Sequence, residues 1–221
     1  LALYRERMQT LEQQPQKLDL FAAQMEKLQQ LEEEDVDMQR QTANVEEMYR
    51  LLKVHKVKVD VSETVRLDDL KHAREKYADE MFAAQEFRDN MKPEMTQQLD
   101  MNIARLNDHL LQMTDQLGLG VFVDGGAEPG DVLTQLEATR IKLEKHAENS
   151  ETYSRYQGLF GINIYEFRNL KEAQDMFQQR HDIWDTYNKW KKRNREWCKQ
   201  DFTELDVNTL ENEVREFLRK S

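Results

Sequence analysis

The sequence has little of what usually interrupts or staples a fold: one cysteine, three prolines and seven glycines among 221 residues. A single cysteine, Cys198, cannot form an internal disulfide, which fits a reducing compartment. No run of about 18 or more apolar residues is present, so we expect no membrane-spanning helix. The first residues lack a signal peptide and an initiator Met. We therefore expect an internal segment of a longer protein.

Patterns that would bind a metal or a phosphate are also missing. The five histidines never come within four residues of one another, and no His-Glu-x-x-His sequence occurs. Gly118-Leu119-Gly120 begins like a dinucleotide fingerprint, but Val123 stands where the third glycine belongs, and no strand is expected before it. No phosphate loop with Gly-Lys-Ser or Gly-Lys-Thr is present. We expect this segment to have no catalytic, cofactor or metal site, and neither to bind nor to hydrolyse ATP.

The charge balance argues against a nucleic-acid binder. The chain has 32 basic and 43 acidic residues, a formal net charge of −11. One local run departs from this balance and is interleaved with Trp190 and Trp197; its basic members are Lys189, Lys191, Lys192, Arg193, Arg195 and Lys199. Six cations within eleven helical positions spread around the whole helix. They indicate a solvated face or salt bridges with a partner rather than a nucleic-acid surface.

What the sequence does contain is the composition of long helices. Charged residues make up 34% and hydrophobic residues 38%, which is polar for a thick core but too apolar for simple disorder. The sparse glycine and proline leave long stretches for strong helix formers. We expect an all-α fold, an extended stack of long antiparallel helices with coiled-coil-like packing.

Prolines, glycines and capping residues indicate where the helices begin and end. We predict helices over residues 1–12, 18–54, 62–117, 130–157 and 167–199, and a sixth from residue 206. Ser62 and Asp206 are the expected N-caps, with Leu205 stapling onto Leu210. Pro129 suits a first helical turn, whereas Pro93 should kink the third helix. Residues 55–61 alternate in polarity and are expected to form a short extended connector.

Apolar seams at heptad-compatible spacing run along these helices. The cleanest has steps of 4, 3, 4, 3 and 4 residues; its members are Leu99, Ile103, Leu106, Leu110, Met113 and Leu117. The second predicted helix has a similar seam of Leu28, Leu31, Met38, Val45 and Leu52. These seams predict helix-to-helix packing.

The main break lies between the third and fourth helices. We divide the chain into a long-helix bundle at 1–117, a glycine-rich connector at 118–130 and a second helical bundle at 131–221. The glycines of the connector are possible hinge residues: Gly118, Gly120, Gly125, Gly126 and Gly130. A rigid loop fixed by packing of residues 121–123 is the equal alternative.

Aromatic residues form the strongest local feature. Along the fifth predicted helix they recur at one-turn and heptad steps; they are Phe177, Trp184, Tyr187, Trp190 and Trp197. We interpret this aromatic stripe as packing anchors of the C-terminal bundle, which can also attach the segment to a neighbouring domain.

The C-terminal stretch resembles a known family. Its successive elements are Leu159-Phe160-Gly161, residues 165–170, the tryptophan-bearing residues 183–190, Glu196-Trp197, residues 202–207 and residues 210–214. Their order and spacing resemble dynein heavy chains at the N-terminal tail to linker region, most closely the axonemal type. The resemblance covers about 60 residues, and the upstream helices match only in kind.

The resemblance implies a force-transmitting segment of an ATP-driven, minus-end-directed microtubule motor in a cilium or flagellum. The sites for ATP and Mg would lie elsewhere in the heavy chain, and no catalytic residue of the family has a counterpart here. Expected partners are intermediate and light chains, neighbouring heavy chains and the rest of the heavy chain, with no nucleic acid and no membrane. The alternative, from a different class, is a static spectrin-like or coiled-coil scaffold.

Overall fold

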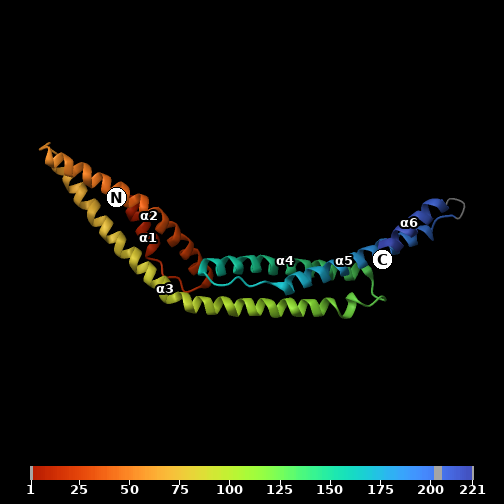
Figure 1. The fold of residues 1–221 in the computed structure, drawn as a ribbon. Coiled ribbons are helices and arrows are strands. Elements are labelled where there is room, and N and C mark those ends of the chain that lie inside the picture. Colours follow the sequence, from red (N-terminus) through yellow and green to blue (C-terminus); the bar gives the residue numbers. More distant parts are fainter. Residues whose placement is uncertain (1, 202–205, 221) are drawn as a thin grey trace. The chain divides into compact units, whose positions relative to one another are not determined.

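The computed structural model describes residues 2–201 and 206–220, and nearly all of them are helical (Figure 1). In chain order the helices are α1 (Ala2–Leu11), α2 (Leu18–Val54), α3 (Val61–Leu117), the short 3-10 helix η1 (Gly120–Phe122), α4 (Pro129–Phe160), α5 (Arg168–Trp197) and α6 (Val207–Lys220). No strand occurs in these residues, which confirms the expected all-α class. Within the same ranges, every helix is either too short or too polar to span a membrane.

The helices form two compact units. Unit 1 contains the residues up to Asp100 together with Tyr156–Asn163, and unit 2 contains Met101–Arg155 together with the residues from Ile164 onward. The expected segments on either side of the glycine-rich connector stay a prediction, and the boundary between the two compact units lies elsewhere. It falls inside α3, because the first half of that helix packs against α1 and α2 and the second half against α4 and α5.

The core of unit 1 joins α1, α2 and the first half of α3. Its buried residues are Tyr4, Met8, Leu11, Leu28, Leu31, Met38, Tyr77, Met81 and Ala84. The Tyr4 ring meets Tyr77 edge-on at 5.3 Å, and its hydroxyl lies 3.0 Å from the Thr42 hydroxyl. The expected α2 seam is thus buried as far as Met38, whereas Val45 and Leu52 are only half-buried.

The last turn of α4 also belongs to unit 1. There the Phe160 ring packs 5.8 Å from Phe21, which is almost fully buried. Gly161 ends the helix with φ of +66°, and the Ile162 N–H then donates to the Gln157 carbonyl at 3.0 Å. This left-handed cap requires glycine or an equally tolerant residue. The helix therefore ends at Phe160, three residues later than the sequence predicted.

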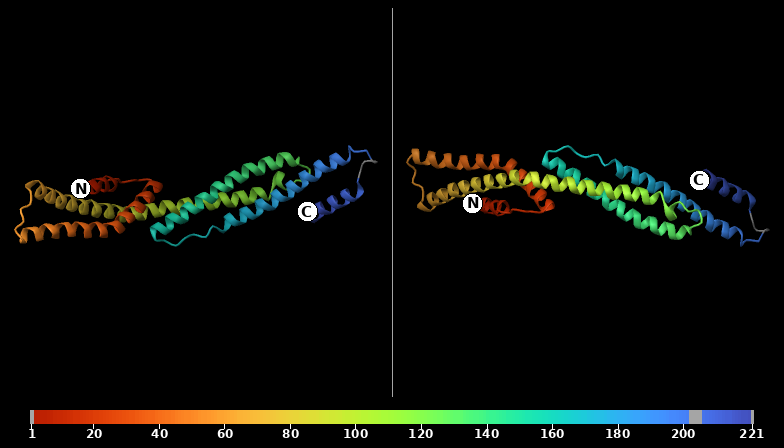
Figure 2. Two further views of the ribbon diagram at one scale, coloured as in Figure 1. Left: turned by 90° about the horizontal axis from the view of Figure 1, so that it is seen from above. Right: turned by 90° about the horizontal axis from the view of Figure 1, so that it is seen from below.

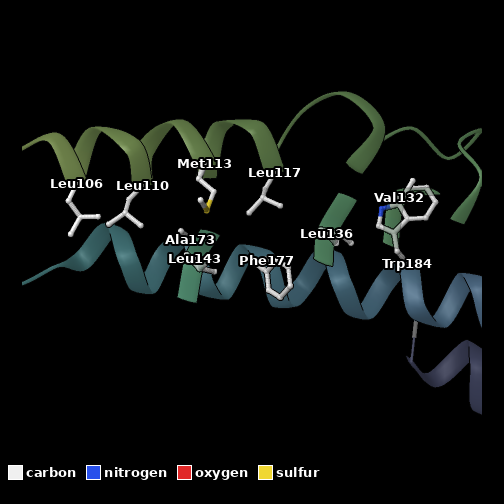
Figure 3. Packing of buried hydrophobic residues seen from close by; sticks show 10 residues of the cluster. All are labelled: Leu106, Leu110, Met113, Leu117, Val132, Leu136, Leu143, Ala173, Phe177 and Trp184. Atoms are coloured by element: carbon white, nitrogen blue, oxygen red, sulfur yellow. The ribbon is translucent and has the colours of Figure 1, made fainter. Parts of the chain in front are cut away.

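The core of unit 2 is built by three helices that run alongside one another in the views of Figures 1 and 2. Figure 3 shows side chains from α3 facing those of α4 and α5. The buried cluster comprises Leu106, Leu110, Met113 and Leu117 from α3, Val132, Leu136 and Leu143 from α4, and Ala173, Phe177 and Trp184 from α5. All six residues of the seam predicted at 99–117 are buried, so that prediction is confirmed.

The helix starts partly follow prediction. Asp206 caps α6 as expected: its carboxylate accepts the Thr209 hydroxyl at 2.6 Å and the Asn208 N–H at 3.0 Å, and these bonds lower the pKa of Asp206. Its expected staple, Leu205, lies outside the described residues. Ser62 was the wrong cap for α3. The helix starts at Val61, and the Asp60 carboxylate accepts the Ser62 N–H at 3.3 Å. Asp60, directly before the first helical residue, thus takes the capping role expected of Ser62.

Two histidines face each other across α3 and α4 in unit 2. The His109 and His146 rings are 5.7 Å apart, and the buried Nδ1 of His146 has no hydrogen-bond partner among the described residues. Burial lowers the pKa of His146, and the positive charges of His109 and Lys145 lower it further. Protonation of this site therefore opposes folding.

We predict that unit 2 loses stability in acid through His146. Because the folded-state pKa of His146 lies below its unfolded value of about 6.5, the unfolded chain binds more protons, and stability falls as the pH drops through that range. Urea unfolding at about pH 7.5 and about pH 5.5 measures the loss, which should shrink in His146→Gln. The control is His55→Gln, an exposed histidine in unit 1. An unchanged pH slope in His146→Gln would contradict the account.

Candidate interaction site

The aromatic stripe of α5 divides between two packing partners. Phe177 and Trp184 are buried in the unit 2 core, and the half-buried Tyr187 ring contacts Trp184 edge-on at 5.8 Å. Trp190 instead packs 5.7 Å from Trp197 and 5.6 Å from Phe217 of α6. The division arises because α4 starts only at Pro129, and α6 supplies the apolar partner for the far end of α5.

The sequence interpretation missed the partnership of α5 with α6. Leu210, Val214 and Phe217 recur at steps of four and three residues, which marks one apolar face of α6. This spacing predicts an amphipathic helix whose apolar face packs against apolar side chains of another element. In the structure, Phe217 on this face packs against Trp190 of α5.

Two side chains of α5 tie the glycine-rich connector to the bundle. The Trp184 indole Nε1–H donates to the Phe122 carbonyl at 2.9 Å, and Arg180 Nε–H donates to the Leu117 carbonyl at 3.0 Å. A buried indole needs such a partner, and an open carbonyl at a helix end gains from a cationic donor. α5 thus holds the connector at Phe122 and the end of α3 at Leu117.

The glycines of the connector differ in what they require. Gly120 has φ of +60°, where a side chain would be strained, whereas Gly118, Gly125, Gly126 and Gly130 do not have positive φ. Gly130 lies inside the first turn of α4 rather than in the loop. The possible hinge at these glycines stays a prediction.

Packing and hydrogen bonds within the connector favour the rigid-loop alternative. Of the three apolar residues expected to fix the loop, Phe122 packs against the unit 2 core, while Val121 and Val123 are exposed. The Asp124 carboxylate accepts the Gly126 N–H at 2.9 Å and closes a local turn. Opening a hinge here would require these contacts and the two bonds from α5 to break.

Members of the basic run of α5 have acidic partners within the chain. Glu128, just before α4, pairs with Lys191, and Arg193 donates to both carboxylate oxygens of Glu213 at 2.6 and 2.8 Å. These hydrogen bonds lower the pKa values of Glu128 and Glu213. The pairs are solvent-exposed, so they orient α6 and the connector more than they stabilise them.

A groove of about 600 Å³ opens between α5, the connector and α6. Its floor is formed by Trp184, Tyr187 and Trp190, and further lining comes from Phe122, Val123, Gly125, Arg180, Ile183, Thr186, Val214, Phe217 and Leu218. Of the lining residues that the structure describes, only Arg180 is charged. Ile183 is 50% exposed and Leu218 is 72% exposed, so the groove presents apolar surface to solvent.

The groove offers surface for binding. Among the described residues, its lining contains no histidine, cysteine or carboxylate that could act as an acid, a base or a nucleophile. Elsewhere in the described ranges, no cluster of three histidine, cysteine, aspartate or glutamate residues could hold a metal ion. Cys198 is exposed after the end of α5. Apolar contact and the Arg180 guanidinium are what the groove offers a partner.

Comparison with known proteins found a partial match to a dynein heavy chain. No protein-family model matches the chain. The human protein dynein axonemal heavy chain 6 is 27% identical to it over 88 residues, which is 40% of this chain and 2% of that heavy chain. The chain therefore spans only a small fraction of this relative's length. The match supports a dynein-like relationship for part of the chain.

We predict that Trp184 contributes more to stability than Trp197. Truncation of a well-buried tryptophan costs about 3–5 kcal/mol. Trp184 lies in the main core of unit 2, whereas Trp197 lies outside that cluster and packs against Trp190 near the end of α5. Chemical unfolding of Trp184→Ala should show the larger loss, and Trp197→Ala a smaller one. If neither substitution lowers stability, the aromatic stripe is not an anchor.

We also predict that the hydrogen bond from Trp184 to Phe122 orders the connector. Trp184→Phe removes the indole donor but keeps an aromatic ring, so amide hydrogen exchange across residues 120–127 should accelerate. Gly125→Ala is the control, because its φ is not positive and an added Cβ meets nothing within 4 Å. Equal exchange in Trp184→Phe and the unmodified chain would show that the bond does not order the loop.

Proposed function

We propose that this chain is a non-catalytic, force-transmitting segment of a dynein heavy chain, from the tail to linker region. The observation that supports this most is the similarity to a dynein axonemal heavy chain, together with the dynein-like order of elements from Leu159 to Val214. The fold suits the role, since α2, α3, α4 and α5 have 37, 57, 32 and 30 residues and pack along buried seams. Helices supported laterally in this way resist bending under load.

The proposed setting follows from the same resemblance. The parent would be an ATP-driven, minus-end-directed microtubule motor of the axoneme, with the sites for ATP and Mg outside this segment. Its partners would be intermediate and light chains, neighbouring heavy chains and the remainder of its own heavy chain. Exposed faces and helix junctions, rather than a cleft with reactive groups, would then carry the function.

A static spectrin-like scaffold is the second candidate. The observation that favours it is the unit 2 core, which is built from three successive helical stretches as in a three-helix repeat. The two candidates differ in what the complete coding sequence contains. Several phosphate-binding loops of the Walker type in the parent protein would support the motor, and their absence would support the scaffold.

The test of force transmission uses the intact heavy chain that carries this segment. Trp184→Ala should leave basal ATP turnover unchanged and lower microtubule gliding velocity, because it loosens the bundle without touching the nucleotide sites. Ile141→Ala is the matched control: Ile141 lies on α4 of the same unit and is 59% exposed. Unchanged gliding in a correctly assembled but destabilised Trp184→Ala motor would argue against a load-bearing role.

A further inference from the structure

We propose that the groove between α5, the connector and α6 binds an acidic amphipathic helix of a partner protein. The proposal does not depend on which parent protein carries the chain. It rests on the shape of the groove, on its exposed apolar surface and on the single charge within it.

The shape of the groove fits a helix. Along α5 its lining runs from Arg180 to Trp190, which at a helical rise of 1.5 Å per residue is about 15 Å, or nearly three turns. A helix lying along this length would present apolar residues at positions i, i+3 or i+4, and i+7. Aromatic rings form the floor, and such rings are common anchors of protein interfaces.

Part of the apolar lining of the groove is exposed to solvent in the described part of the chain. Ile183, Leu218 and Val123 come from three different elements, line the same groove and are each at least half exposed. Exposed apolar residues that converge in this way mark binding surfaces more often than residues scattered singly. The open wall formed by Ile183 and Leu218 suits a side-on helix better than a lipid chain, which binds best in an enclosed cavity.

Charge decides which helix fits. Arg180 uses Nε on the Leu117 carbonyl, and no carboxylate within the described ranges forms an ion pair with it. A glutamate or aspartate at the edge of the incoming helix would supply that partner. The nearby cations add less to this preference, because Lys189, Lys191 and Arg193 already pair with Asp185, Glu128 and Glu213.

The test measures binding of labelled model peptides to the 221-residue chain by fluorescence anisotropy. The first peptide is a helix with a leucine stripe edged by glutamates, the second replaces those glutamates with lysines, and the third is a scramble of the first. The proposal expects saturable binding of the glutamate peptide and clearly weaker binding of the other two. Equal binding of the glutamate and lysine peptides, or no binding of either, would overturn it.

Variants locate the site. Ile183→Glu and Leu218→Glu each place a charge in the apolar lining and should lower the affinity for the glutamate peptide by about tenfold or more. Arg180→Gln should remove the preference for the glutamate peptide over the lysine peptide. Ile141→Glu, on an exposed face of α4, is the control and should bind as the unmodified chain does. Because all four positions lie outside the fully buried core, circular dichroism is expected to show them folded.

Two further outcomes would reassign the groove. Self-association of the unmodified chain, abolished by Ile183→Glu and competing with the peptide, would make a second copy the occupant. Binding to anionic lipid vesicles in preference to the peptide, lost in the same variant, would make a membrane surface the occupant. Either result contradicts the proposal of a partner helix.

Discussion

The constraint on which both units depend is the narrowness of their apolar seams. Charged residues make up 34% of the chain, so each helix has only a stripe of hydrophobic side chains to bury. Such a stripe stabilises the fold only when neighbouring helices bury it. In unit 2, α4 and α5 bury Leu106, Leu110, Met113 and Leu117 of α3. Packing of seam against seam therefore sets which helices are neighbours, and the surface electrostatics have little part in it.

The candidate interaction site follows from the limits of those seams. Unit 2 has three packed helices only where α4 is present, and α4 starts at Pro129. The end of α5 reaches past that point and carries Trp190 and Trp197. Trp190 packs against Phe217 of the shorter α6 and against Trp197. The connector contacts α5 at Trp184 and α6 contacts it at Trp190, and an apolar groove opens between them. The groove is thus a consequence of unequal helix lengths around one aromatic stripe.

Local signals made the helices predictable. The α2 bounds and the last residue of α3 agree with the expectation, because Pro15 and Gly118 interrupt strong helix formers. The seam from Leu99 to Leu117 was readable from its spacing. The boundary within α3 could not be predicted from the sequence. Both halves of that helix carry an apolar stripe of the same kind, and only tertiary contacts show which helices pack against each half. The bonds from Trp184 and Arg180 to the connector were equally hidden, since they join residues about 60 positions apart in sequence.

The most direct test of the seam account compares two adjacent leucines on α3. Leu110 is fully buried in the unit 2 core, whereas its neighbour Leu111 is 47% exposed. Chemical unfolding of unit 2 should show that Leu110→Ala lowers the free energy of unfolding by about 2–5 kcal/mol, and that Leu111→Ala changes it by no more than about 0.5 kcal/mol. Equal losses for the two substitutions would contradict the account, because they would mean that α3 does not present one buried seam to α4 and α5.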